Sequence, residues 1–119
     1  MFDSKQIFSI QSEKDFQHVA LEVFRYQAQE NEVYKNFLKF LNIDYKTINH
    51  TDDIPFLPIQ FFKKYEIVSG NRAVEKVFTS SGTTGMATSQ HLVTDLALYH
   101  YSLEKCFEQF YGPLNDYTI

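Results

Sequence analysis

A run of small hydroxyl residues and glycines, from Thr79 to Ser89, constrains the fold of this chain more than any other feature. The run reads TSSGTTGMATS, with glycine at positions 82 and 85. Glycine readily adopts positive φ, which ends regular helices and strands. The apolar residues before this run and Gln90 to Val93 after it are typical of strands. We therefore expect two strands joined by this run, and not a helix beginning within it.

Apolar residues recur at helical spacing in the N-terminal part of the chain. Ser12 is placed to cap a first helix, with Asp15 as the partner in a capping box. A second helix is predicted from about Glu32 to Leu41, and Asn42 is a suitable C-terminal stop because Asn tolerates the left-handed conformation. We expect the two helices to form an antiparallel pair.

A further helix is predicted after the loop, with Thr94 or Asp95 as its cap and Gly112-Pro113 as its end. Its apolar residues stand three or four positions apart: Leu96, Tyr99, Leu103, Cys106, Phe107 and Phe110. We expect Cys106 to be a buried structural cysteine on this stripe.

Between the two helical parts, residues 43–53 show no period and are expected to form a loop. Pro55 and Pro58 favour extended backbone before them, and Pro58 is suited to begin a short helix through Lys63. Residues 65–68 and 73–79 flank the turn-forming residues 69–72, which predicts a hairpin. The predicted fold class is α/β: N-terminal helices over 1–52, then a strand–loop–strand unit and a packed helix over 53–119.

Composition narrows the classes of function. The 119 residues fit one domain, and eleven Lys and Arg against fifteen Asp and Glu form no basic stripe, so we expect no nucleic-acid partner. A single cysteine excludes an internal disulfide and favours a reducing compartment. The chain contains no apolar run of membrane-spanning length, and its first residues lack the pattern of a signal peptide. We therefore expect a cytoplasmic protein.

The Ser-Gly-Thr run has the composition of a phosphate-binding loop. Glycine permits close approach of backbone N–H groups to an anion, and Ser and Thr add hydroxyl donors. Four hydroxyl residues interleaved with Gly82 and Gly85, directly after an apolar strand, form a cradle of this kind. The alternative is a flexible polar turn, since the same residues are common in turns. A Walker loop is excluded, because that motif needs Lys directly after its last glycine and Met86 stands there.

Residues 81–85, SGTTG, resemble the phosphate loop of the adenylate-forming superfamily of acyl-activating enzymes. Ala87 stands where that family often has Pro, and Thr88 where many members have Lys. The phenylacetate-CoA ligase branch also has Thr there. The segment from Asp53 to Lys63, DIPFLPIQFFK, is similar to the one that precedes this loop in acyl-protein synthetases. The resemblance thus covers most of the chain from Asp53 onward, and it implies that residues 53–119 begin an adenylation domain within a larger adenylate-forming fold.

This resemblance implies ATP with Mg²⁺, a fatty or aryl carboxylic acid, and a thiol acceptor, either coenzyme A or a protein cysteine. The carboxylate would attack the ATP α-phosphate to give acyl-AMP and pyrophosphate, and the thiol would then take the acyl group. The residues that would hold the β- and γ-phosphates are Ser80, Ser81, Gly82, Thr83, Thr84 and Gly85. The family's magnesium-binding acidic motif, ribose-binding aspartate and C-terminal lysine domain have no counterpart here, so we expect an N-terminal fragment that is inactive alone. The alternative is a non-catalytic truncated module that self-associates or binds a partner protein.

The remaining candidate residues are assigned structural roles. The four histidines show no metal-ligand spacing, so no metal site is predicted, and His91 is expected to be an exposed strand residue. Asp52 and Asp53 are expected to be solvated. Four aromatic residues near the prolines could line an acyl channel, but we expect them to pack in the core. They are Phe56, Phe61, Phe62 and Tyr65. In a fragment, the helix from Leu96 to Phe110 and the strand leading to Phe78 would expose apolar surface, and the isolated chain would self-associate.

Overall fold

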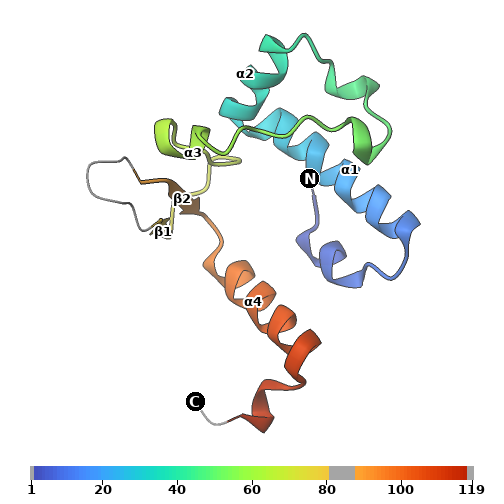
Figure 1. Cartoon of the computed structure of the whole chain (residues 1–119), viewed down its shortest axis with the longest axis vertical. Coiled ribbons are helices and arrows are strands. Elements are labelled where there is room, and N and C mark those ends of the chain that lie inside the picture. Colours follow the sequence, from blue (N-terminus) through green and yellow to red (C-terminus); the bar gives the residue numbers. More distant parts are fainter. Residues whose placement is uncertain (1, 81–87, 118–119) are drawn as a thin grey trace.

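The computed structural model describes residues 2–80 and 88–117. Within these residues, four helices and two strands follow one another (Figure 1): α1 (Glu13–Glu30), α2 (Glu32–Phe40), α3 (Phe61–Lys64), β1 (Lys76–Thr79), β2 (Gln90–Val93) and α4 (Leu96–Tyr111). Short 3₁₀ turns lie at Ser4–Ser9, Tyr45–Thr47, Thr51–Asp53 and Leu114–Asp116. The described part is mostly helical and carries one two-stranded antiparallel sheet. None of its helices is long and apolar enough to cross a membrane.

Helix α1 begins as the sequence predicts. The Ser12 hydroxyl accepts a hydrogen bond from the Asp15 backbone N–H at 3.1 Å, and the Asp15 carboxylate accepts from the Gln11 N–H at 3.2 Å. These two bonds satisfy amide donors that the first turn of a helix leaves without a partner.

Asn31 joins α1 to α2 and is the one polar residue among those buried in the described structure, at 5% exposure. Its backbone N–H donates to the Gln27 carbonyl at 3.0 Å, which ends α1, and its side-chain oxygen accepts from the Tyr34 N–H at 3.1 Å, which begins α2. Helix α2 then ends one residue earlier than predicted, and Asn42 has the expected positive φ of 57°.

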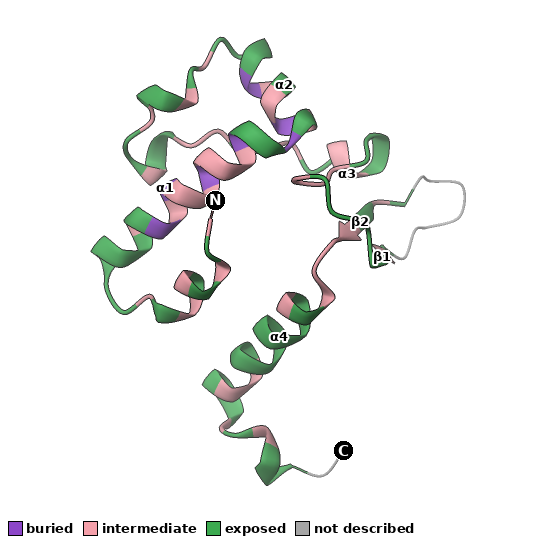
Figure 2. Ribbon diagram, turned by 180° about the vertical axis from the view of Figure 1, so that it is seen from behind, coloured by how far each residue is buried: buried purple, intermediate pink, exposed green. Residues whose placement is uncertain are grey.

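The core lies where α1 and α2 pack on each other (Figure 2). It consists of Phe24 and Ala28 from α1 and Tyr34 and Leu38 from α2. Partly buried side chains from the following segments close over it: Phe37, Ile43, Tyr45, Ile48, Ile54 and Leu57. The segment 43–57 is therefore held by apolar contacts although it forms only short turns.

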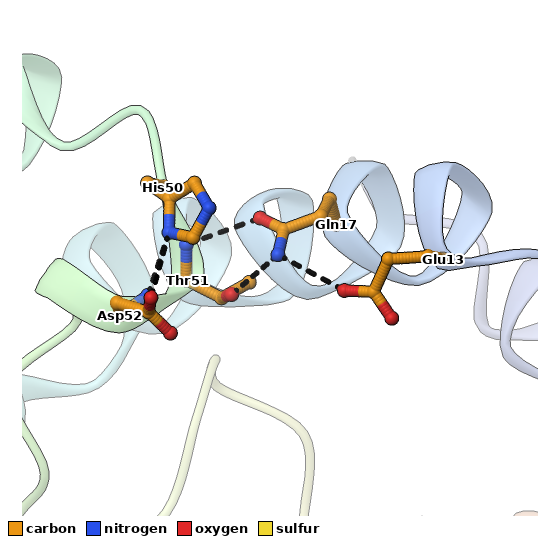
Figure 3. Close-up of polar contacts among 5 residues, drawn as sticks. All are labelled: Glu13, Gln17, His50, Thr51 and Asp52. Atoms are coloured by element: carbon orange, nitrogen blue, oxygen red, sulfur yellow. Dashed lines mark hydrogen bonds and ion pairs between the residues drawn. The ribbon is translucent and has the colours of Figure 1, made fainter.

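A polar clamp fixes the same segment to α1 (Figure 3). The Gln17 amide nitrogen donates to the Thr51 hydroxyl at 2.8 Å and to the Glu13 carboxylate at 3.2 Å, while the Gln17 oxygen accepts from the Thr51 N–H at 3.2 Å. Next to it, His50 Nδ1 accepts from the Asp52 N–H at 3.2 Å. Asp52 and Asp53 are exposed, as predicted.

Strands β1 and β2 pair in antiparallel register, with Phe78 opposite His91 and Thr79 opposite Gln90. This confirms that the strands on either side of the Ser-Gly-Thr run belong to one unit.

The predicted hairpin between residues 65–68 and 73–79 is wrong. Ser69 instead forms an isolated bridge with Asn31, and the Gly70 N–H donates to the Glu30 carbonyl at 2.8 Å. The Ser69 hydroxyl also donates to the Gln27 side chain. The junction of α1 and α2 has therefore taken the hydrogen-bonding groups that the predicted turn would have used.

Helix α4 is capped by the Asp95 side chain and ends at Gly112, whose φ of 81° suits glycine. Two aromatic pairs join it to earlier parts of the chain: Tyr99 stacks on Phe78 with ring centroids 4.9 Å apart, and Tyr101 meets Phe8 edge-on at 4.7 Å. No residue of α4 is buried. In Figure 1 this helix extends away from the α1–α2 core.

Two predictions of burial are wrong. Cys106 is exposed, because its side of α4 faces solvent and not a packed layer. Phe56 and Tyr65 are also exposed, at 85% and 51%, while Phe61 and Phe62 are half-buried. The core against which these aromatic residues were expected to pack is formed by α1 and α2 alone.

Candidate functional site

The base of the Ser-Gly-Thr run is closed by two serines. The Ser80 N–H donates to the Ser89 carbonyl at 3.0 Å. In return, the Ser89 N–H donates to Ser80 Oγ at 3.0 Å, and the Ser89 hydroxyl donates to the same atom at 2.8 Å. These three bonds continue the β1–β2 pairing by one step and hold the two ends of the segment 81–88 together.

The structure describes one of the six predicted phosphate ligands. Ser80 is described and exposed. Ser81, Gly82, Thr83, Thr84 and Gly85 lie outside the described residues, so their part in the site stays a prediction. The structure gives the frame of the loop, namely the paired strands and the Ser80–Ser89 contacts.

Ser89 is a residue of this frame that the sequence reasoning did not assign to the site. A signal was present, since one serine stands at the beginning of the run and one at its end. The two serines can bond to each other only if the ends of the two strands face each other. Whether they do depends on the register of β1 and β2, which the structure gives.

Two helices support the hairpin from one side. Phe78 and His91 are directly opposite each other, and opposite residues of an antiparallel pair share a face. On this face Phe78 stacks on Tyr99 of α4, and His91 stacks on Phe62 of α3 with ring centroids 5.0 Å apart. His91 is exposed, as predicted. Its stacking on Phe62 gives it a packing role in the hairpin.

Polar contacts attach the hairpin to the start of α4. The Glu75 N–H donates to the Val93 carbonyl at 2.8 Å, and the Glu75 carboxylate accepts from the Leu96 N–H at 2.9 Å. Arg72 pairs with Asp95 at 3.2 Å. The hydrogen bond from the Leu98 amide, together with Arg72, lowers the pKa of the Asp95 carboxyl. The first turn of α4 is thus anchored beside the two strands.

Among the described groups at Ser80 and Ser89, the contacts between the two serines leave the Ser80 hydroxyl proton available for donation, and no carboxylate lies with it. Hydroxyl and amide donors bind phosphate oxygens, whereas Mg²⁺ requires oxygen acceptors, commonly from carboxylates. The described part of the chain brings no group of three His, Cys, Asp or Glu side chains together. The described residues therefore do not fit the magnesium ion that the resemblance implies, and we assign it no ligand in this chain.

Two open hollows of the described structure lie in its N-terminal half, and neither is lined by the hairpin. One, of about 380 Å³, lies between the first 3₁₀ turn and α1, and is bordered by Asp3, Lys5, Asp15 and His18. The other, of about 390 Å³, lies between the end of α1 and α2. Neither hollow is lined by Ser80 or Ser89, so neither adds residues to the candidate phosphate site.

Comparison with known proteins supports one family. The long-chain-fatty-acid–luciferin-component ligase of Photorhabdus luminescens is 31% identical to this chain over 77 residues. These residues are 64% of this chain and 66% of the relative, so the match spans just under two thirds of that protein. No solved structure matches the chain.

The family is shown by a match to a sequence model that describes a whole protein family. The model of the family described as "Acyl-protein synthetase, LuxE" matches residues 2–102. The match includes the N-terminal helices, the hairpin and the run between its strands, and it extends into α4. The chain therefore belongs to the LuxE family of acyl-protein synthetases.

Proposed function

We propose that this chain carries the phosphate-holding part of an ATP-dependent acyl-protein synthetase. In the proposed reaction a carboxylate oxygen attacks the α-phosphorus of ATP, and the bond to the bridging oxygen of pyrophosphate breaks. The product is an acyl-adenylate. A thiolate then attacks the acyl carbon and AMP leaves with the electron pair of the broken C–O bond.

The observation that carries this proposal is the position of the SGTTG motif within a chain of the LuxE family. The motif lies between two paired strands whose ends are joined by Ser80 and Ser89. Because Ser80 and Ser89 are bonded to each other, the segment between them has fewer conformations to lose when it closes on an anion. Pre-organised donors stabilise charge on a leaving group without having to reorient during the reaction.

Ser80 is the described residue best placed to take part. Its oxygen accepts from both the N–H and the hydroxyl of Ser89, which uses its two acceptor positions. Its own hydroxyl proton is then the group available for donation to a phosphate oxygen. We propose that Ser80 and residues 81–85 together hold the β- and γ-phosphates.

The proposed substrate is a fatty or aryl carboxylic acid. A fatty acid is the better choice, because the relative from Photorhabdus luminescens is named as a long-chain-fatty-acid ligase. The proposed acceptor is a thiol, from coenzyme A or from a protein cysteine.

Titration with inorganic pyrophosphate, followed through the backbone amide signals by NMR, tests the phosphate-holding role. We expect saturable shifts at residues 80–85 and 89. A Thr83→Ala, Thr84→Ala double variant should bind pyrophosphate at least about a hundredfold more weakly, since two hydrogen bonds to a charged acceptor are lost and each contributes about 1.5 to 3 kcal/mol. Ser102→Ala is the matched control, because it removes an exposed hydroxyl from α4. Shifts confined to other parts of the chain would contradict the proposal.

A second candidate function is a non-catalytic module that binds a partner protein or itself. The exposed apolar side chains of α4 favour it, since Leu103 and Phe110 are 57% and 73% exposed. In that case pyrophosphate would leave the signals of residues 80–85 unchanged.

A further inference from the structure

Ser80 and Ser89 differ in how far solvent reaches them. The two residues continue the β1–β2 register by one step, so they lie opposite each other and their side chains share a face. Ser80 is exposed, whereas Ser89 is half-buried. The Ser80 side chain is therefore the more accessible of the two to a ligand that arrives from solvent.

The bonds from Ser89 fill both acceptor positions of Ser80 Oγ. The Ser89 N–H donates to this oxygen at 3.0 Å, and the Ser89 hydroxyl donates to it at 2.8 Å. A hydroxyl oxygen has one bond to carbon, one bond to hydrogen and two lone pairs. Because the two Ser89 donors occupy the lone pairs and Cβ a third direction, one direction is left for the Ser80 proton. Ser89 thus determines where the Ser80 hydroxyl donates.

Only one of the three bonds between these serines depends on the side chain at position 89. The bond from the Ser89 N–H to Ser80 Oγ and the bond from the Ser80 N–H to the Ser89 carbonyl use the backbone of residue 89. Without the Ser89 hydroxyl, one lone pair of Ser80 Oγ becomes free, and the Ser80 proton can take two directions instead of one. The direction of this proton can therefore be changed while the backbone pairing of the hairpin remains.

Aromatic stacking holds the hairpin close to both serines. Side chains two positions apart on a strand point to the same face. Phe78 stands two positions before Ser80, and His91 two positions after Ser89, and these rings stack on side chains of α4 and α3. Each strand is thus held next to its serine, so loss of one side-chain hydrogen bond should leave the strand ends in place.

From these contacts we infer that Ser89 is a positioning residue of the phosphate site. Its hydroxyl orients the Ser80 hydroxyl for donation to a phosphate oxygen and does not itself touch the anion. This inference rests on the proposed function and adds a residue that acts through Ser80. An oriented donor does not have to turn when it meets the charge, and a hydroxyl that accepts hydrogen bonds donates a stronger one.

Pyrophosphate titrations followed by NMR, at one pH and one ionic strength, test this role. Ser80→Ala should weaken binding at least about tenfold, because a hydrogen bond to a charged acceptor is lost. Ser89→Ala should weaken it about threefold, since the Ser80 bond remains but loses its fixed direction and part of its strength. In a chain that already carries Ser80→Ala, Ser89→Ala should have no further effect, because a positioning residue acts only through its partner.

Two further variants complete the series. Ser89→Thr keeps a hydroxyl, and threonine suits a strand end, so this variant should bind pyrophosphate as the wild type does. Ser102→Ala removes a hydroxyl from α4 and is the matched control, with no expected change in affinity.

Hydrogen exchange separates orientation of the proton from opening of the hairpin. The Ser80 N–H donates to the Ser89 carbonyl and reports on this end of the strand pair. In Ser89→Ala its exchange rate should stay within about twofold of the wild-type rate. Much faster exchange would assign the loss of affinity to an opened hairpin and overturn the positioning role.

The titrations also separate this inference from the proposed function. A wild-type chain that does not bind pyrophosphate would overturn both. Binding that Ser89→Ala leaves unchanged or strengthens would overturn the positioning role alone, because the Ser89 hydroxyl would then not direct the Ser80 proton toward the anion. Losses that add in the double variant would also overturn it, since they indicate direct contact between Ser89 and the anion.

Discussion

At the scale of single residues, Tyr34 shows how one side chain can join separate segments. Tyr34 is 8% exposed, and its ring meets Phe24 edge-on, with ring centroids 6.1 Å apart. Its hydroxyl donates to the Pro55 carbonyl at 2.6 Å, which ties α2 to the proline-containing segment. Burial raises the pKa of Tyr34 to about 12.

Replacing Tyr34 with Phe should lower the free energy of unfolding by about 1 kcal/mol at neutral pH, because the hydrogen bond to Pro55 is lost. The unfolded chain deprotonates Tyr34 near pH 10, below the pKa in the fold. The contribution of this hydroxyl is therefore complete below about pH 10 and declines as the pH rises toward 12.

Denaturant unfolding at pH 7 and at pH 11 checks both points. The difference between the wild type and Tyr34→Phe should be smaller at the higher pH. Tyr65→Phe serves as the control, since Tyr65 is 51% exposed. A difference that grows with pH would contradict the assigned role of burial.

At the scale of elements, the first turn of α4 depends on Asp95. The Asp95 carboxylate accepts from the Leu98 N–H at 3.0 Å and from Arg72 at 3.2 Å. The bond from the Leu98 amide is the main cause of the lowered pKa of Asp95. Because this pKa lies below that of the unfolded chain, the carboxylate stabilises the turn at neutral pH, and the contribution is lost as the pH falls through the lowered value.

We predict that Asp95→Ala makes the Leu98 amide exchange with solvent several-fold faster at neutral pH, because the cap is lost. Asp95→Asn should keep an acceptor for this amide while removing the acid dependence. Hydrogen exchange at the Leu98 amide, measured between pH 3 and pH 7, separates the three proteins. Equal exchange in the wild type and Asp95→Ala would show that the cap does not stabilise the turn.

At the scale of the whole molecule, stability is concentrated in the N-terminal half. The buried apolar residues of the described structure all belong to α1 and α2: Val19, Leu21, Phe24, Ala28, Tyr34 and Leu38. The hairpin and α4 are held by aromatic pairs and hydrogen bonds at the surface. The N-terminal helices should therefore unfold as a unit, with little contribution from α4.

Two phenylalanines of adjacent helices test this distribution. Phe24 is 4% exposed and Phe40 is 81% exposed. Phe24→Ala should cost about 3 to 5 kcal/mol, through the lost transfer free energy and the cavity that remains. Phe40→Ala should change the free energy of unfolding by less than about 0.5 kcal/mol. The midpoint of chemical denaturation, followed by circular dichroism, measures both, and similar losses in the two variants would contradict this location of the core.

The helix ends of this protein follow from the sequence alone. Ser12 and Asp95 begin helices, and Asn42 and Gly112 stand within two residues of a helix end with positive φ. These residues act on backbone groups a few positions away, so their effect can be read without knowledge of distant contacts. The same reasoning placed a strand on each side of the Ser-Gly-Thr run, and the family match supports the resemblance on which the proposed function rests.

Only the tertiary structure decided which segments meet. The polar groups near Ser69 and Gly70 could have closed a hairpin with the following residues, but the junction of α1 and α2 at Asn31 binds them instead. Cys106 lies on an apolar stripe, yet it is exposed because no element of the described chain covers that part of α4. The apolar spacing of a helix determines which side chains share a face, whereas burial of that face requires a partner, and the position of a partner depends on contacts far apart in sequence.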